Sequence, residues 1–210
     1  LRIIWYDRKK EREQDMKKNR QKAIILLIAL TLSLSGCGPF RKTENIDAGM
    51  EAVMALDYDE AILSFEAAKA AEENPRELYR GLGLAYMGKT QYAEAAAAFK
   101  TALSYSDGIP DAMDYDINYY LATAYKTKGD EENAIVALEK SLTSKQYGKF
   151  ACGELVMLCD KLGKTEMKDK YIKYGYDNYK DMSQYGQWLL TSLLEKQDWD
   201  ASLVLCDEMI

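Results

Sequence analysis

One spacing constrains the fold of this chain more than any other feature, because the same residues return every 34 positions. The pattern Ala-x3-Phe-x2-Ala begins at Ala61 and begins again at Ala95, 34 residues later. Apolar residues three and four positions apart share one face of a helix. A helical unit of this length cannot bury its apolar face alone, so several copies are expected to stack around a continuous core.

The residues around the second copy identify the kind of repeat. The second copy is preceded by the pattern Tyr-x2-Leu-Gly-x2-Tyr, from Tyr79 to Tyr86. Together the two patterns resemble the tetratricopeptide repeat, which consists of a helix A and a helix B. Small residues are expected where the two helices approach, at Gly83 and Ala95. The resemblance implies an all-α fold, a right-handed superhelix of stacked helix-turn-helix repeats.

The period can be followed along the rest of the chain. Ala134 lies 39 residues after Ala95, which predicts a five-residue insertion near 104–114. Two more steps of 34 reach Lys168 and Ser202, in repeats that keep fewer of the pattern residues. We therefore expect about five repeats, two of them degenerate, in a domain over residues 43–210. The expected helix pairs are 43–55 and 58–72, 76–88 and 91–105, 113–128 and 130–143, 148–162 and 165–179, and 183–196 and 198–210.

The N-terminal segment differs from the repeats in charge. Residues 1–36 hold nine Lys/Arg and four Asp/Glu, whereas the remaining residues hold 19 and 30. A basic run followed by 16 uncharged residues up to Gly38 is typical of a secretory signal peptide. The uncharged segment is shorter than the roughly 20 residues of a membrane-spanning helix. We expect a signal peptide over 16–36, with residues 1–15 an untranslated or N-terminal extension before a start at Met16.

Leu-Ser-Gly-Cys at residues 34–37 resembles the lipobox of bacterial lipoproteins. In that family the cysteine carries the lipid and becomes the first residue after cleavage. The resemblance implies that Cys37 is the lipidation site and that residues 37–42 are a lipidated tether. It also implies a protein anchored through palmitate or similar chains at the extracytoplasmic face of a bacterial cell membrane, since several acyl chains on one residue anchor stably.

Composition and motif context argue against an enzyme. The chain has no histidine, the commonest general base and metal ligand, and its acidic body argues against nucleic acid. Gly83 to Thr90 matches the phosphate-loop pattern G-x-x-x-x-G-K-[ST], but Gly83 falls inside an expected helix instead of after a strand. Asp114-x-Asp116-x-Asn118 lacks the glycine and the twelfth-position acid of a calcium loop. We expect no catalytic residue, metal or cofactor.

The cysteines of the body are expected to be core thiols. Cys152, Cys159 and Cys206 fall at packing positions of their repeats, and the first two lie seven residues apart on one helix, too far for a disulfide. Six tyrosines are not all accounted for by the packing of the repeats, and some of them are expected to face solvent. They are Tyr119, Tyr120, Tyr171, Tyr174, Tyr176 and Tyr179.

We interpret the body as a protein–protein interaction scaffold or assembly factor for a cell-envelope complex, with a peptide or protein partner in its concave groove. By resemblance to the family, helix A lines this groove. The carboxylate clamp of chaperone-binding relatives is missing, so a C-terminal carboxylate is not the expected ligand. Two alternatives stay open: a partner site elsewhere, and a solute- or glycan-capturing lipoprotein that uses exposed tyrosines. The predicted groove residues are Glu77, Arg80, Leu84, Met87, Asp116, Tyr119, Thr123, Lys126, Phe150, Met157 and Asp160.

The C-terminal helix 198–210 predicts a second contact surface. One apolar stripe at helical spacing is expected to pack on residues 183–196, whereas Val204 and Leu205 lie outside it with no later segment to bury them. We therefore expect this helix to dock on another copy, as a homodimer, or on a partner. The stripe residues are Trp199, Leu203, Cys206 and Ile210.

The lipid anchor can be tested directly. Replacing Cys37 with Ser should block acylation, because the hydroxyl does not replace the thiol as the lipid acceptor, and leave the protein unprocessed or misplaced. Labelled palmitate should enter the wild type and not the variant. Incorporation of palmitate into the Cys37→Ser protein would contradict the lipobox interpretation.

Overall fold

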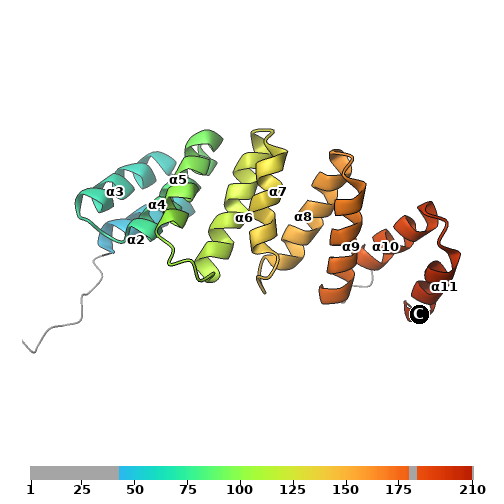
Figure 1. The fold of residues 1–210 in the computed structure, drawn as a ribbon. Coiled ribbons are helices and arrows are strands. Elements are labelled where there is room, and N and C mark those ends of the chain that lie inside the picture. The colour runs from blue at the N-terminus through green and yellow to red at the C-terminus, as the bar shows by residue number, and fades with distance from the viewer. Residues whose placement is uncertain (1–42, 180–183, 210) are drawn as a thin grey trace, which may run out of the picture. The chain divides into compact units, whose positions relative to one another are not determined.

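The computed structural model describes residues 43–179 and 184–209, and every regular element within them is an α-helix (Figure 1). The expectations for residues 1–42, including the start at Met16, the signal peptide and Cys37, lie outside the described residues. None of the described helices is long and apolar enough to span a membrane. The helices are α2 (Glu44–Met54), α3 (Tyr58–Ala70), α4 (Pro75–Gly88), α5 (Tyr92–Ser104), α6 (Ala112–Thr127), α7 (Glu131–Ser141), α8 (Gly148–Lys161), α9 (Thr165–Tyr179), α10 (Gln184–Glu195) and α11 (Trp199–Glu208).

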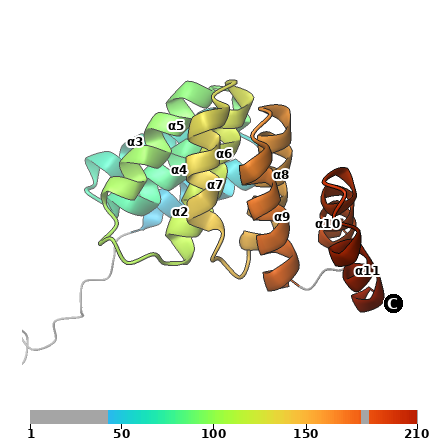
Figure 2. The same ribbon diagram turned by 45° about the vertical axis from the view of Figure 1, so that its right-hand side comes forward.

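The helices form five successive pairs, α2/α3 through α10/α11, and each pair packs against the next (Figures 1 and 2). The first helix of one pair also contacts the first helix of the next, as α2 does with α4 and α4 with α6. The predicted all-α fold of stacked helix-turn-helix repeats is confirmed, and the helices occupy the ranges that the period indicated.

The turns inside the pairs repeat as regularly as the helices. In each turn one residue adopts a positive φ, at Leu56, Thr90, Gly129, Gly163 and Gln197, with spacings of 34, 39, 34 and 34 residues. In each turn the next amide donates to a carbonyl five residues earlier, as Asp57 N–H does to Ala52 and Asp198 N–H does to Leu193, both at 2.9 Å. This is the bond that closes a helix C-terminus around a left-handed residue. The turn geometry of the backbone is therefore the same in the fourth and fifth helix pairs, although their side-chain pattern is degenerate.

The 39-residue step reflects a longer loop between the second and third pairs. Helix α5 ends at Ser104 and α6 begins at Ala112, so the predicted insertion lies in this loop. Asp111 caps α6 by accepting from the amide of Asp114 at 2.9 Å, and the Asp114 carboxylate accepts in return from the amide of Asp111 at 3.2 Å. This reciprocal cap satisfies amides that have no partner inside the helix.

Aromatic rings of the second helices fill spaces that glycines of the first helices leave open. The Phe65 ring of α3 lies against Gly49 of its own pair and against Gly81 of the next pair, and a Cβ atom at either glycine would collide with it. Phe99 of α5 meets Gly83 of α4 in the same way. Phe99 also stacks on Tyr120 of α6, with ring centroids 6.1 Å apart, so each of these fully buried rings closes its own pair and contacts a neighbouring pair.

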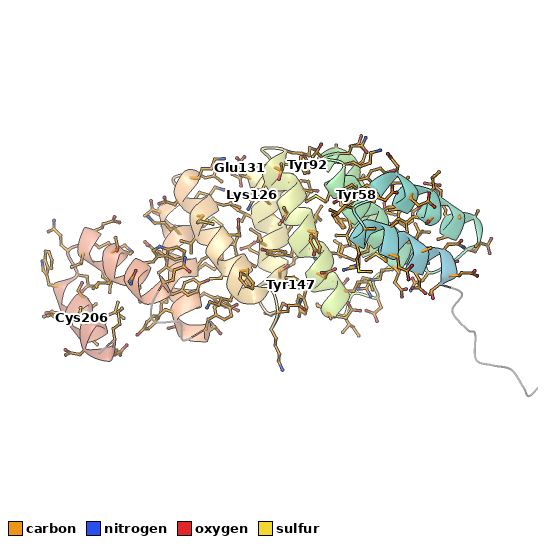
Figure 3. All side chains as sticks on the ribbon, turned by 180° about the vertical axis from the view of Figure 1, so that it is seen from behind. Tyr58, Tyr92, Lys126, Glu131, Tyr147 and Cys206 are labelled. Atoms are coloured by element: carbon orange, nitrogen blue, oxygen red, sulfur yellow. The ribbon has the colours of Figure 1, made fainter. Side chains whose placement is uncertain are left out.

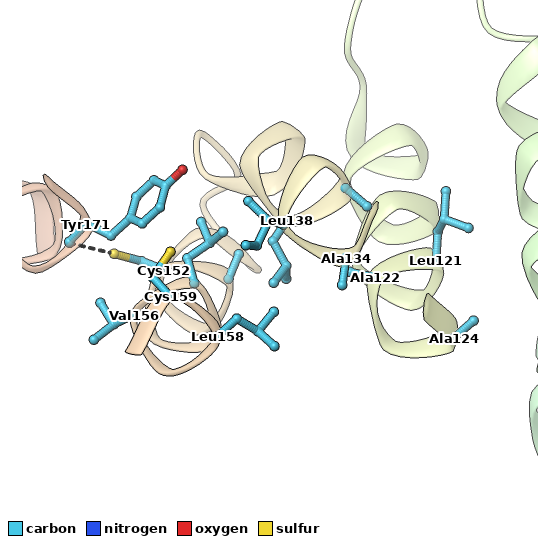
Figure 4. Packing of buried hydrophobic residues seen from close by; sticks show 14 of the residues in the cluster. Leu121, Ala122, Ala124, Ala134, Leu138, Cys152, Val156, Leu158, Cys159 and Tyr171 are labelled. Atoms are coloured by element: carbon cyan, nitrogen blue, oxygen red, sulfur yellow. Dashed lines mark hydrogen bonds between the residues drawn. The ribbon is translucent and has the colours of Figure 1, made fainter. Parts of the chain in front are cut away.

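Helices α6, α7 and α8 contribute aliphatic and sulfur side chains to the buried cluster (Figure 4). Cys152 and Cys159 of α8 are buried, and the Cys152 thiol donates to the Tyr171 carbonyl at 3.1 Å. Burial raises the pKa of the Cys152 thiol to about 11. The described cysteines are free thiols, as predicted, and Cys206 is half-buried.

The predicted packing of the C-terminal helix is wrong except at Val204, which is 59% exposed as expected. Leu205, expected to be uncovered, is only 4% exposed, whereas Trp199 and Leu203 of the predicted buried stripe are 59% and 66% exposed. The repeat step explains the difference, because Leu205 occupies the position of Ala137, which is buried in its own repeat. The apolar surface at this end therefore consists of Trp199, Leu203 and Val204.

The contact between paired helices can be tested at Ala95 of α5. Ala95 is fully buried, so Ala95→Leu should overpack the second repeat and lower the free energy of unfolding by about 1–3 kcal/mol. Ala97→Leu is the matched control, because Ala97 is exposed on the same helix, and its effect should stay within about 0.5 kcal/mol. Urea unfolding measures both. Equal stabilities of the two variants would show that Ala95 does not hold this pair together.

Candidate protein-binding groove

Two hollows lie side by side over the first helices of the last three pairs. One, of about 330 Å³, is lined by Tyr119 of α6, by Phe150 and Met157 of α8 and by Trp188 of α10. The other, of about 260 Å³, lies over α8, α9 and α10 and shares Met157 and Trp188. These two side chains therefore form a ridge between adjoining concavities.

Helix α8 presents its apolar side chains to the hollow because its other face is already buried. Phe150 and Met157, two turns apart, are 63% and 53% exposed, whereas Ala151, Leu155 and Cys159 of the same helix are fully buried. A helix with apolar residues on both faces is partly uncovered wherever only one face meets the core. The exposed face of α8 is thus an apolar surface with no cover among the described residues.

The charged groove residues nearer the N-terminus are engaged with one another. Arg80 of α4 forms an ion pair with Asp116 of α6, and the Tyr147 hydroxyl donates to the other oxygen of Asp116 at 2.5 Å. Burial and the Asp116 carboxylate raise the pKa of Tyr147, so its hydroxyl keeps the proton that it donates. Arg80 and Asp116 therefore join the second and third repeats instead of awaiting a ligand.

The same holds for the charged residues further along. Lys126 of α6 pairs with Glu154 of α8, and Asp160 of α8 accepts from Lys168 of α9 at 2.9 Å. The Tyr119 ring stacks on Tyr147 with ring centroids 5.1 Å apart. Because these charges neutralise each other within the chain, the apolar side chains between them dominate what the hollow offers to a ligand.

The remaining predicted residues have local contacts. Glu77 accepts from the Asn74 side chain at 2.5 Å, and the Thr123 hydroxyl donates to the Tyr119 carbonyl at 3.1 Å. Leu84 and Met87 are partly buried against the core. All eleven predicted residues lie on α4, α6 or α8, and those that line the larger hollow are Tyr119, Phe150 and Met157.

Sequence reasoning missed the contribution of α10. Gln184, Tyr185 and Trp188 line the larger hollow, but the predicted groove stopped at the fourth repeat. The signal was present, since a step of 34 from Phe150 reaches Gln184 and a step of 34 from Glu154 reaches Trp188. The fifth repeat keeps this position although its sequence pattern is degenerate.

The six tyrosines are more enclosed than expected, although half-buried rings such as Tyr119, which lines the larger hollow, still reach solvent. Tyr171 is 1% exposed and donates to Glu139, and Tyr179 donates to the Leu142 carbonyl at 2.8 Å. Burial raises the pKa of both hydroxyls. None of the six is largely exposed, because each is buried or packs against the core: Tyr119, Tyr120, Tyr171, Tyr174, Tyr176 and Tyr179.

The residues that match the phosphate-loop pattern and those that resemble a calcium loop have roles in helix packing and helix capping. Gly83 and Gly88 both lie inside α4, where each faces an aromatic ring of a neighbouring helix. Asp114 lies in the first turn of α6, where the positive end of the helix dipole favours an acid, and pairs with Arg76. Within the described part of the chain, no three His, Cys, Asp or Glu side chains are placed to hold a metal ion.

Comparison with known proteins agrees with this architecture. The sequence profile of the tetratricopeptide repeat matches residues 77–107 and 115–146, which hold the second and third pairs. No curated protein matches the chain. A crystal structure of the MamA protein is 18% identical, with a TM-score of 0.60 over 80% of this chain and 88% of that one. MamA of AMB-1 is 15% identical over 80% and 90%, with a TM-score of 0.58.

A third solved structure is more distant in sequence. It is a putative kinesin light chain of Podospora anserina with nearly identical repeats, 13% identical, with a TM-score of 0.56 over 80% of this chain and 92% of that one. At these identities the likeness establishes the fold, which is that of tetratricopeptide-repeat proteins. Such proteins are generally interaction scaffolds and not enzymes.

The ion pairs between repeats predict a pH dependence at Asp111. Two hydrogen bonds from Arg76, at 2.6 and 2.7 Å, lower the pKa of Asp111 to about 2. A carboxyl whose pKa is lowered by folding stabilises the fold above its unfolded pKa of about 4, and loses this effect as the pH falls through its folded pKa. Asp111→Asn keeps a capping side chain but removes the charge.

We therefore expect Asp111→Asn to be less stable than wild type at pH 6, with most of this difference lost by pH 2. The loss at pH 6 should be at most about 1 kcal/mol, because half of the Asp111 side chain is exposed. Urea unfolding across this pH range measures the difference. A difference that does not change with pH would show that the Arg76 contact carries no charge-dependent stabilisation.

Proposed function

We propose that this tetratricopeptide-repeat protein is a membrane-anchored scaffold that binds a peptide or protein partner in the groove over α6, α8 and α10. The observation that carries the proposal is the exposure of Phe150 and Met157, beside Trp188, at the border of two hollows. Apolar residues gathered in a concavity are a common feature of binding surfaces.

The groove favours a ligand with apolar side chains. Glu154, which lines the larger hollow, already pairs with Lys126, so a basic ligand would have to compete with an existing ion pair. Burial of apolar surface contributes roughly 25 cal/mol per Å², so covering Phe150 and Met157 would supply binding energy without breaking any polar contact. An amphipathic helix or an extended peptide with alternate apolar residues has this character.

The sequence outside the described residues supports the location in the proposal. Basic residues, an uncharged run and the Leu-Ser-Gly-Cys box end at Cys37, six residues before the first described residue. A lipid on Cys37 would hold the repeats beside the membrane on its extracytoplasmic side. We propose that the scaffold acts there as an assembly factor for a cell-envelope complex.

The alternative of glycan or solute capture lacks a supporting observation. Its basis was a set of solvent-facing tyrosines, and the tyrosines concerned are buried or packed against the core. A protein or peptide ligand therefore remains the proposal that the geometry favours.

Site-specific crosslinking tests the groove. A photoreactive benzophenone side chain at Met157 should crosslink to a protein partner in cells, because Met157 is exposed at the centre of the groove. The same side chain at Val136 is the matched control: Val136 is 52% exposed, nearly as much as Met157 at 53%, but lies on α7 outside the groove-lining set. Crosslinked products should be absent at Val136, and Phe150→Ser should reduce those at Met157.

The crosslinks also distinguish other outcomes. The same products at Val136 and Met157 would contradict a site in the groove. Crosslinks to polysaccharide without a protein would favour the glycan alternative. Circular dichroism of Phe150→Ser should match the wild type, because this side chain is largely outside the core.

A further inference from the structure

The end of the described repeats carries an apolar flank on α11. Trp199 and Leu203 are 59% and 66% exposed and lie one helical turn apart, hence on the same side of the helix. No described residue covers them. This surface is separate from the groove, which is lined by α6, α8, α9 and α10.

Comparison with earlier repeats shows that exposure is not a general feature of the Leu203 position. The repeat steps place Leu203 at the position of Ile135 and Ala96, which are 3% and 4% exposed. Val204, in contrast, occupies the position of Val136 and Leu63, which are 52% and 64% exposed. Stacking therefore buries the Leu203 position in the second and third repeats and covers most of the equivalent Asp169 side chain in the fourth, whereas the Val204 position stays open throughout.

The start of α11 also has the sequence of the start of α3. Residues 57–63 read Asp-Tyr-Asp-Glu-Ala-Ile-Leu and residues 198–204 read Asp-Trp-Asp-Ala-Ser-Leu-Val. Both segments have a capping aspartate, an aromatic residue, a second acid, a small residue and two aliphatic residues in the same order. The two helices thus present similar flanks.

The contacts that α4 makes with α3 show which side chains pack against such a flank. Gly88 of α4 lies against the Tyr58 ring, and Lys89 pairs with Asp59. At a later junction Glu132 of α7, which occupies the position of Asp59, pairs with Lys164 at 2.6 Å. Tyr58 and Glu131 lie along the same edge of the repeats (Figure 3). At α11 the equivalent residues are Trp199 and Asp200.

We propose that the α11 flank binds a helix of a partner protein that resembles the first helix of a repeat. Such a helix has a glycine or alanine that faces Trp199, an apolar side that covers Leu203, and a C-terminal lysine that pairs with Asp200. The charge of α11 favours a basic partner, since this helix carries Asp200, Asp207 and Glu208 and no Lys or Arg.

A second copy of this chain fits the flank poorly. Its α2 carries Asp47, Glu51 and Met54 at the positions where α4 has Gly81, Ala85 and Gly88. The Asp47 and Glu51 carboxylates are exposed and would face the acids of α11. Like charges across a contact oppose association.

The test uses the chain's own α4 as the probe. A labelled peptide of residues 74–91, stapled through positions 80 and 84 to hold it helical, is titrated against the full-length protein by fluorescence anisotropy. Arg80 and Leu84 contact later repeats, so the staple leaves the α3-facing side intact. The peptide should bind the wild type.

Variants of α11 locate the site. Trp199→Ala and Leu203→Ser should each weaken binding about tenfold, as expected for central contacts of an interface. Val204→Ser is the matched control, because Val204 is as exposed as Trp199 but occupies a position that stacking does not bury; it should change binding less than about twofold. Circular dichroism should be unchanged in all three proteins.

A charge exchange tests the lysine. The peptide with Lys89→Glu should bind the wild type weakly and should recover affinity for the Asp200→Lys protein. Absence of binding by the stapled peptide, or equal binding to the Leu203→Ser protein, overturns the proposal. A dimer in light scattering that Leu203→Ser dissociates overturns it in favour of a second copy. None of these outcomes changes the crosslinks expected at Met157, so the proposed binding site in the groove is tested independently of the α11 flank.

Discussion

The contact between an aromatic ring and a glycine closes the first two repeats and joins the first to the second. Phe65 fills the space that Gly49 leaves within one pair and the space that Gly81 leaves in the next pair. A single side chain thus ties the internal contact of a repeat to the contact between repeats, so neither can loosen alone. In stacked repeats, stability is the sum of such nearest-neighbour terms, and loss of one spreads to those beside it.

The polar contacts between successive first helices follow from this packing. Once packing of the buried cluster fixes the distance between α4, α6 and α8, the Arg80–Asp116 and Lys126–Glu154 pairs can form across the gaps. These pairs occupy charges that would otherwise face a ligand. What remains open toward the C-terminus is the apolar surface around Met157, and for this reason the groove favours apolar ligands.

The two ends of the described repeats differ in chemistry. Where α4 of the second repeat has Gly81 and Ala85, α2 has Asp47 and Glu51, which make the first flank polar. Where inner repeats are covered by a following helix, Trp199 and Leu203 of α11 are exposed. The scaffold therefore offers two surfaces of different kinds, a groove for an apolar segment and a flank shaped for a helix with a small-residue side and a basic end.

The sequence by itself determined the helices, their pairing and the small and large residues that pack between them, because these depend on local spacing and on a period that Ala61, Ala95 and Ala134 reveal. Which groove residues stay available was decided only by tertiary structure. Arg80 and Asp116 are 36 residues apart and pair because neighbouring helices bring them together. The burial of Leu205 and the exposure of Leu203 depend likewise on which side of α11 meets α10 and which side a further helix would cover.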